Sequence, residues 1–190
     1  MSDISLTCSG GWVQGVRWLP SPNFNARPLD AVIDLLVIHN ISLPPGQFGG
    51  DHVDALFCNS LECEADPYFQ ALRDLRVSAH FFINRSGQVT QYVSLDDRAW
   101  HAGVSQWNGR DQCNDFSIGI ELEGTDVTPY TDAQYTALVG LTKVLMLRYP
   151  AITLARIVGH SDIAPGRKTD PGEAFDWVRF RTGLCENVTQ

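Results

Sequence analysis

Two strand-like runs that each lead into a histidine constrain the fold of this chain most. Leu35 to Ile38 is an uninterrupted apolar run that ends at His39, and a shorter run over residues 156–159 ends at His160. Short, uninterrupted apolar runs are typical of strands that are covered on both faces. We therefore predict that both runs are strands of one sheet, whose carboxyl ends bring the two imidazoles to the same edge.

The segment from Gly159 to Gly172 places a histidine, a cation and carboxylates within one stretch that contains Pro and Gly. Two imidazoles and one carboxylate are the donor set of a catalytic zinc ion, whose fourth position is left to water. Asp170 is the preferred carboxylate because the Pro-Gly pair that follows it can fix its backbone in a sharp turn. Asp162 is the alternative carboxylate, and the alternative to a shared metal is a set of unrelated polar residues at strand ends.

The rest of the chain alternates between strand-like and helix-like segments. The predicted strands are residues 77–84 and 88–93, which pair as a hairpin, and residues 116–122. The clearest helix follows Thr131, which forms a capping-box pattern with Gln134, and it ends at Pro150. A shorter helix is predicted over residues 51–60. This mixture predicts an α/β (α+β) fold with a central mixed sheet flanked by helices.

Length and charge bound the domain count and the class of partner. A chain of 190 residues is expected to form one domain over residues 1–190. Within it, residues 1–30 are predicted to be an irregular lead-in anchored by Trp12 and Trp18, and residues 183–190 a tail. The net charge is 14 − 22 = −8, whereas non-specific nucleic-acid binding needs a basic surface. We therefore expect no nucleic-acid partner, and we infer no obligate protein partner.

Cysteine usage and the first residues indicate a cytoplasmic protein. The five cysteines are odd in number and lack the paired spacing of a zinc knot, which favours reduced thiols in a cytosol. The N-terminal residues lack the basic start and the apolar core of a secretion signal. No apolar run approaches the ~20 residues of a membrane span. We therefore predict a cytoplasmic location and no membrane partner.

Two carboxylates on one predicted strand are candidates for a general base. In residues 117–124, strand alternation places Glu121 and Glu123 on the face opposite the apolar side chains. A carboxylate beside a bound metal can take a proton from water. Glu121 is preferred because it lies deeper in the run. The alternative is a strand face that is simply solvated.

Three further residues allow a functional and a structural interpretation. Lys168 lies two residues before Asp170, where its ammonium can stabilise an oxyanion, although single loop lysines are usually solvated. His80 is predicted to be a core histidine with satisfied hydrogen bonds. His101 follows Trp100 in a turn that contains glycine, and this pair fits either a sugar or peptide subsite or core packing.

Several long segments in the same order resemble the AmpD-type N-acetylmuramoyl-L-alanine amidases, which are related to phage amidases and peptidoglycan recognition proteins. The resemblance covers roughly residues 12–182. It is carried by residues 37–46, 75–80, 98–105, 113–126 and 159–172. It implies a mixed sheet flanked by helices, in agreement with the pattern above, and an enzyme of the bacterial cytoplasm.

The resemblance also implies a role for each matching residue. It implies that Zn²⁺ is bound by His39, His160 and Asp170. It implies that Glu121 activates water and that Lys168 stabilises the transition state. The implied substrate groove contains Asn40, Arg76, Trp100 and His101.

The implied reaction is zinc-dependent hydrolysis of the amide between N-acetylmuramic acid and L-alanine. The substrates would be cytoplasmic muropeptides recycled from the cell wall, in their 1,6-anhydro form. Arg76 and Arg110 are expected to offset the charge of −8 for a substrate that carries carboxylates.

The sequence departs from the family pattern in two places. Gln112 stands where the family often has a basic residue, which affects an expected contact to a peptide carboxylate, and residues 58–68 match weakly. Two alternative functions remain at this stage: a lytic amidase that acts on polymeric peptidoglycan, and a non-catalytic binder of wall fragments. The non-catalytic binder is expected to lack a zinc ligand or the base.

Overall fold

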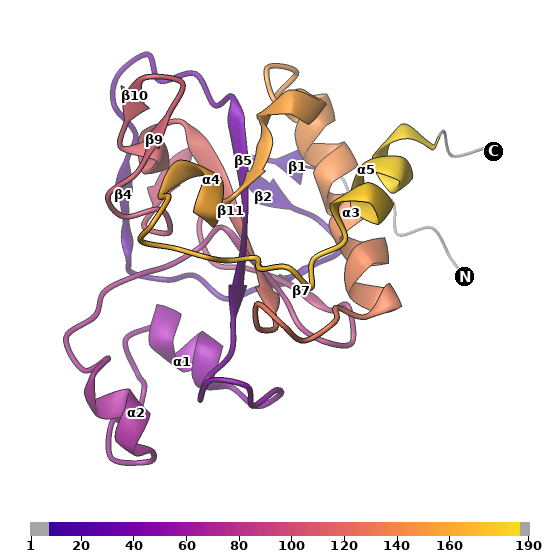
Figure 1. The fold of residues 1–190 in the computed structure, drawn as a ribbon. Coiled ribbons are helices and arrows are strands. Elements are labelled where there is room, and N and C mark those ends of the chain that lie inside the picture. Colours follow the sequence, from indigo (N-terminus) through magenta and orange to yellow (C-terminus); the bar gives the residue numbers. More distant parts are fainter. Residues whose placement is uncertain (1–7, 187–190) are drawn as a thin grey trace.

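A six-stranded mixed sheet forms the centre of the computed structural model, which describes residues 8–186 (Figure 1). Its strand order is β12-β5-β11-β6-β7-β3. The strands are β3 (Arg17–Trp18), β5 (Leu35–Ile41), β6 (Phe81–Ile83), β7 (Val89–Gln91), β11 (Ser117–Glu123) and β12 (Ile157–Gly159). The pairs from β12 to β6 are parallel, whereas β6 and β7 form the predicted antiparallel hairpin. The predicted mixed sheet flanked by helices is confirmed.

The helices lie around the sheet rather than within it. They are α1 (His52–Phe57), α2 (Pro67–Gln70), α3 (Asp132–Arg148), α4 (His160–Ile163) and α5 (Trp177–Cys185), with 3₁₀ turns at η1 (Cys113–Asp115) and η2 (Leu154–Arg156). Figure 1 shows α3 and α5 side by side, and α1 and α2 beyond the carboxyl end of β5. Across residues 8–186, none of these helices is both long and apolar enough to cross a bilayer.

The predicted capping box begins α3. The Thr131 Oγ1 accepts a hydrogen bond from the Gln134 backbone N–H at 3.1 Å, and the Gln134 Oε1 accepts one from the Thr131 N–H at 3.1 Å. These two bonds satisfy donors that the first turn of a helix otherwise leaves unpaired. The helix therefore begins where the sequence pattern predicts.

The two faces of β5 and β11 carry different chemistry because side chains alternate along a strand. One face contributes apolar side chains to the core beneath α3, namely Leu36, Ile38, Ile118, Ile120 and Leu122. The other face begins with buried apolar residues Leu35 and Val37 and then changes to polar residues. On this second face, His39 and Glu121 lie directly opposite each other.

Several predicted boundaries differ from those in the structure. The strand predicted over residues 77–84 is shortened to β6, because residues 78 and 80 bond to the backbone of residues 100 and 119 outside the β6–β7 ladder. Strand β5 continues two residues past His39 instead of ending there. The lead-in is not wholly irregular, and residues 183–185 of the predicted tail belong to α5. The parts of these predictions on residues 1–7 and 187–190 lie outside the described residues.

Short strands of the lead-in pair either with each other or with distant parts of the chain. The small pairs outside the central sheet are β1 (Cys8–Ser9) with β2 (Trp12–Val13), β4 (Phe24–Ala26) with β8 (Asp97–Ala99), and β9 (Gln106–Trp107) with β10 (Arg110–Asp111). The rings of Trp12 and Trp18 contact each other with centroids 5.6 Å apart. The Trp18 Nε1–H also donates to the Val13 carbonyl at 2.7 Å. These contacts hold the lead-in together, and the pairing of β3 with β7 attaches it to the sheet.

Candidate active site

Parallel strand pairing brings three of the predicted site residues together. Because β11 pairs in parallel with β5, Glu121 lies opposite His39. Because β12 pairs with the other edge of β5, Gly159 lies opposite Ile38. The chain enters α4 at His160, immediately after β12. The two histidines therefore lie on neighbouring strands at the same edge of the sheet.

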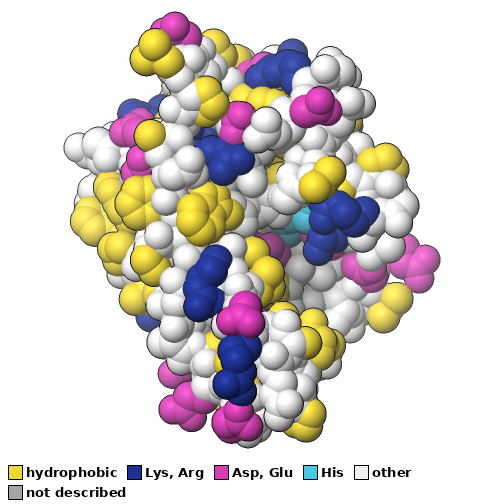
Figure 2. Space-filling view, turned by 90° about the vertical axis from the view of Figure 1, so that its left-hand side faces the viewer, with side chains coloured by type: hydrophobic (Ala, Val, Ile, Leu, Met, Phe, Trp, Pro, Cys, Tyr) yellow, Lys and Arg dark blue, Asp and Glu magenta, His cyan; other side chains and the backbone are white. Residues whose placement is uncertain are grey.

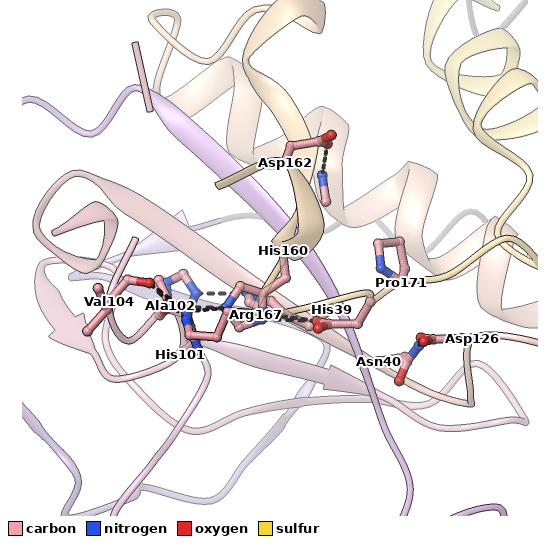
Figure 3. A network of polar contacts seen from close by, with 12 residues as sticks. His39, Asn40, His101, Ala102, Val104, Asp126, His160, Asp162, Arg167 and Pro171 are labelled. Atoms are coloured by element: carbon pink, nitrogen blue, oxygen red, sulfur yellow. Dashed lines mark hydrogen bonds and ion pairs between the residues drawn. The ribbon is translucent and has the colours of Figure 1, made fainter. Parts of the chain in front are cut away.

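The carboxylate of Asp170 joins the two imidazoles in a buried cluster. The Nδ1 atoms of His39 and His160 are 2.9 Å apart (Figure 3), and the Asp170 Oδ2 is 3.1 Å from each of them. The Asp170 carbonyl accepts a hydrogen bond from the Ser161 N–H at 3.0 Å, which folds residues 161–170 back onto α4. The imidazoles are almost fully buried, and 13% of the Asp170 side chain is exposed. Two nitrogens and one carboxylate oxygen thus converge on one point.

Hydrogen bonds and burial define the protonation of this cluster. The His160 Nε2 lies 3.1 Å from the Ala102 carbonyl oxygen, which can only accept, and 3.4 Å from the Arg167 Nη2, which can only donate. The shorter contact favours a proton on Nε2, so the Nδ1 of a neutral ring presents its lone pair. Burial lowers the pKa of His39 to about 4, although contact with Asp170 opposes the shift, so this ring is neutral near pH 7. Burial acts to raise the pKa of Asp170, but contacts with His160 and His39 lower it below its usual range.

This protonation pattern fits a metal ion. An ionised carboxylate and a bare ring nitrogen that lie 3.1 Å apart repel each other, and a bound cation removes that repulsion. Among the described residues, this is the one group of His, Cys, Asp and Glu side chains whose ligand atoms lie close enough to share an ion. The donors are therefore arranged as the sequence hypothesis requires.

Two alternative carboxylates are already engaged by backbone N–H groups. The Asp162 Oδ2 accepts from the Gly159 N–H at 2.7 Å, at the start of α4. Glu123 accepts from the N–H of Gly49 and, at 2.8 Å, from that of Arg85. Both side chains therefore hold loops in place, and this role distinguishes them from Asp170 and Glu121.

Glu121 is in a different state from Glu123, although both lie on the same strand face. Its Oε2 is buried and has no hydrogen-bond partner within residues 8–186. Burial raises the pKa of this carboxyl well above its ordinary value of 4.5, the charge of Asp170 raises it further, and Lys168 opposes the shift. A carboxylate with an open acceptor and a raised pKa is suited to taking a proton near neutral pH.

A cavity of about 590 Å³ opens over the cluster. Glu121, Lys168, Asp170 and His160 all contribute to its lining. Figure 2 shows a histidine side chain at the floor of a hollow, beside basic side chains on the rim. The volume falls within the range that is usual for sites that bind small molecules.

The residues assigned to the substrate groove lie in different environments. Asn40 and Trp100 line the cavity, where the Asn40 Nδ2 donates to Asp126 at 2.8 Å and the Trp100 Nε1 donates to Asn25 at 2.7 Å. His101 also borders the cavity, but its ring is buried next to His39. The contacts of these residues with a substrate are not tested by their positions and stay predictions.

The two arginines expected to attract substrate carboxylates are not among the cavity-lining residues. Arg76 is exposed, and its Nη1 donates to the carbonyls of residues 73 and 75. Arg110 donates to Asp34 at 2.7 Å and stacks on the Phe116 ring at 3.6 Å from its centroid. Because Asp34 also pairs with Arg156, the expected attraction of substrate carboxylates by Arg110 stays a prediction. Arg167 and Lys168 are the basic residues that line the cavity.

Sequence reasoning missed the contribution of Gly119. A Cβ added at this position would lie 2.4 Å from the His101 Cγ, so only glycine leaves room for that ring against β11. A glycine inside an otherwise apolar strand is a signal of such a close approach. His80, in contrast, is fully buried and accepts from the Gly119 N–H at 3.1 Å, as expected of a core histidine.

Comparison with known families decides the class of this site. The family described as N-acetylmuramoyl-L-alanine amidase matches residues 29–173, which include the cluster, Glu121 and Lys168. The chain belongs to this amidase family. The protein is therefore an enzyme that cleaves the amide between N-acetylmuramic acid and L-alanine.

Two comparisons with AmpD are informative for this amidase. It is 56% identical to 1,6-anhydro-N-acetylmuramyl-L-alanine amidase AmpD of Escherichia coli K12, over 94% of this chain and 97% of that protein. A crystal structure of a selenomethionine derivative of AmpD matches with a TM-score of 0.90 and 56% identity, covering 93% of this chain and 98% of that one.

A more distant relative has been solved with a substrate. Escherichia coli AmiD in complex with anhydro-N-acetylmuramic acid-L-Ala-D-γ-Glu-L-Lys matches with a TM-score of 0.60 and 29% identity, covering 94% of this chain and 65% of that chain. Together with the AmpD relatives, this match confirms the resemblance to AmpD-type amidases that the sequence motifs indicated.

Proposed function

We propose that this amidase uses one Zn²⁺, held by His39, His160 and Asp170, to release L-alanyl peptides from 1,6-anhydro-N-acetylmuramic acid during cell-wall recycling in the cytoplasm. The observation that carries the proposal is the convergence of three ligand atoms beside Glu121, whose buried Oε2 has no hydrogen-bond partner among residues 8–186. The AmpD relatives, which are named for the 1,6-anhydro substrate, support the choice of sugar.

The donor set favours zinc. Two of the three ligand atoms are imidazole nitrogens, which suit zinc better than magnesium or calcium. A bound zinc ion supplies a lowered pKa for water and an electrophile that polarises the scissile carbonyl. His160 keeps its Nδ1 lone pair available because its Nε2–H is held by the Ala102 carbonyl.

Glu121 is the proposed general base and acid. It takes a proton from the attacking water and returns it to the amine of L-alanine as the amide bond breaks. Its raised pKa supports both steps, because a carboxyl that titrates closer to neutral pH gives up a proton as readily as it accepts one. Its position opposite His39 in the β5–β11 register places it beside the cluster.

Lys168 is the proposed donor to the oxyanion. It lines the cavity two residues before Asp170, and its charge is close enough to Glu121 to oppose the rise in the pKa of that carboxyl. A charged donor aimed at developing negative charge lowers the barrier of acyl transfer. Among the substrate contacts, Asn40 and Trp100 are supported by their place in the cavity lining. For Arg76, the support is that Leu75 and Val77 on either side of it line the cavity.

Product analysis tests the proposal. The metal-free protein, reloaded with zinc, is incubated with soluble anhydromuropeptides and, separately, with intact sacculi, and the products are identified by mass spectrometry. The proposal predicts free peptide and free anhydro sugar, with faster turnover on the soluble substrate. Faster turnover on sacculi would favour a lytic amidase, and no release from either substrate would favour a binder of wall fragments. The Asp170→Ala variant, which lacks a ligand, serves as the matched control without activity.

A further inference from the structure

A chain of buried hydrogen bonds connects His39 to the backbone of η1. The His39 Nε2 lies 2.9 Å from the His101 Nδ1 (Figure 3), and the His101 Nε2 lies 3.2 Å from the Ser117 Oγ. The Ser117 Oγ lies 2.6 Å from the Cys113 carbonyl oxygen. Ser117 is fully buried, and His101 is 9% exposed. The chain thus runs from the metal cluster to a fixed carbonyl group inside the protein.

The fixed carbonyl sets the direction of every bond in this chain. Two oxygens that lie 2.6 Å apart need a proton between them, and the carbonyl has none, so Ser117 donates to Cys113. The Ser117 Oγ then accepts from the His101 Nε2–H. A neutral His101 with its proton on Nε2 has a bare Nδ1, which accepts from the His39 Nε2–H. The Nδ1 of His39 is therefore left as a lone pair facing the cluster.

We propose that His101 and Ser117 are positioning residues that act through His39, fixing its tautomer and ring orientation so that Nδ1 points at the metal. This inference rests on the proposed zinc site. It assigns His101 a role beneath the cluster instead of a direct contact with the sugar or the peptide. The tight fit of the His101 ring against Gly119 supports this role, because the ring has no room to turn toward β11.

The same short segment also orients His160. The acceptor of the His160 Nε2–H is the carbonyl of Ala102, the residue that follows His101. The Asn114 Oδ1 accepts from the backbone N–H of His101 at 3.1 Å and from that of Ala102 at 2.8 Å. One buried carboxamide therefore holds the segment that supplies an acceptor to each metal-facing imidazole. Outer partners of this kind orient metal-binding histidines and tune their affinity for the ion.

Two variants of similar size separate positioning from packing. In His101→Asn, the Oδ1 replaces the Nδ1 as an acceptor for the His39 Nε2–H. In His101→Leu, no acceptor remains. Zinc affinity is measured by competition with a chromophoric chelator. The proposal predicts that His101→Leu weakens zinc binding by about 10- to 100-fold and that His101→Asn restores most of this loss. Equal affinities for both variants and the wild type would overturn it.

A second readout does not depend on bound zinc. Histidine-ring ¹⁵N NMR of the metal-free wild type is expected to show the proton of His101 on Nε2 and that of His39 on Nε2. A proton on the His101 Nδ1 would overturn the proposal even if zinc binds normally. If the tautomers are as expected but the wild type binds no zinc, the proposed function fails and the assigned hydrogen-bond direction stands.

Ser117→Ala tests the same hydrogen-bond chain if His101→Leu does not fold. This variant removes the acceptor of the His101 Nε2–H and also the hydrogen bond from Ser117 to the Cys113 carbonyl. The preference for that tautomer should therefore weaken, and zinc affinity should fall by less than in His101→Leu. A thermal unfolding curve of each metal-free variant verifies that the chain is folded. Unchanged ¹⁵N tautomers and unchanged zinc affinity in Ser117→Ala would contradict the role of Ser117.

Discussion

The two faces of β11 perform opposite tasks within the same seven residues. Ile118, Ile120 and Leu122 point into the core beneath α3, where burial of apolar surface stabilises the fold. Glu121, on the opposite face, is a carboxylate with a buried oxygen that has no partner in the described part of the chain, and burying such a group costs stability. One strand thus combines an apolar face that stabilises the fold with a buried carboxyl group that destabilises it.

The first prediction compares Glu121 with Glu123. Glu121→Gln should lower kcat by about 10²- to 10⁴-fold, because the base is lost, while the metal-free protein becomes more stable. Glu123→Gln should leave kcat close to that of the wild type. It should cost about 1–3 kcal/mol of stability, because one of the two N–H donors at Gly49 and Arg85 loses its acceptor. Steady-state kinetics and urea unfolding of both variants provide the measurement. Similar kcat values for the two variants would remove the distinction between the two carboxylates.

The second prediction alters the apolar face. Ile120 is fully buried in the core, so Ile120→Ala should destabilise the protein by about 2–5 kcal/mol through lost burial and a residual cavity. The activity of the folded fraction should stay close to that of the wild type, because this side chain points away from the cavity. Denaturant titration and kinetics at a temperature where the variant is folded provide the measurement. A large loss of kcat in the folded variant would show that the two faces are coupled.

Much of this comparison follows from the sequence alone. The runs before His39 and His160 are apolar enough to predict burial, and burial on both faces is typical of parallel strands. Alternation then places Glu121 opposite the apolar side chains. These inferences depend on contacts within a strand or on strong local patterns, which a single sequence carries.

Other features depend on long-range contacts that leave no local pattern. The two residues of β3 are too few to show a period, so its pairing with β7 was not predicted. The pairing of Arg110 with Asp34 joins residues that are 76 positions apart. The place of His101 beneath His39 depends on the room that Gly119 leaves, and glycine in a strand signals a close approach without naming the partner.

The third prediction concerns the pH dependence of stability. Because burial raises the pKa of Glu121 above its ordinary 4.5, the folded protein holds this proton more tightly than the unfolded chain does. Below the ordinary pKa, the carboxyl is uncharged in both the folded and the unfolded state, so no charge is buried. As the pH rises toward the raised pKa of the folded state, the free-energy cost of burying the charge grows. The stability of the metal-free wild type relative to Glu121→Gln should fall as the pH rises above the ordinary pKa of 4.5. A difference that is constant with pH, measured by urea unfolding, would contradict the raised pKa.

The smallest expected effect lies far from the cavity. Thr131→Ala removes the side-chain half of the capping box of α3 and a 2.8 Å hydrogen bond to the Arg85 carbonyl, and it should cost about 1 kcal/mol of stability. Kinetic constants should stay unchanged. A shift in the thermal midpoint with no shift in KM or kcat is the expected signature, and a change in KM would show that α3 influences the cavity.

Isothermal titration calorimetry of zinc binding to the metal-free protein tests the central claim most directly. The wild type is predicted to bind one zinc ion per chain, and His39→Ala, His160→Ala and Asp170→Ala are each predicted to lose most of that affinity while remaining folded. A wild type that binds no zinc, or three variants that bind it as tightly as the wild type does, would contradict the claim that these three side chains form one metal site.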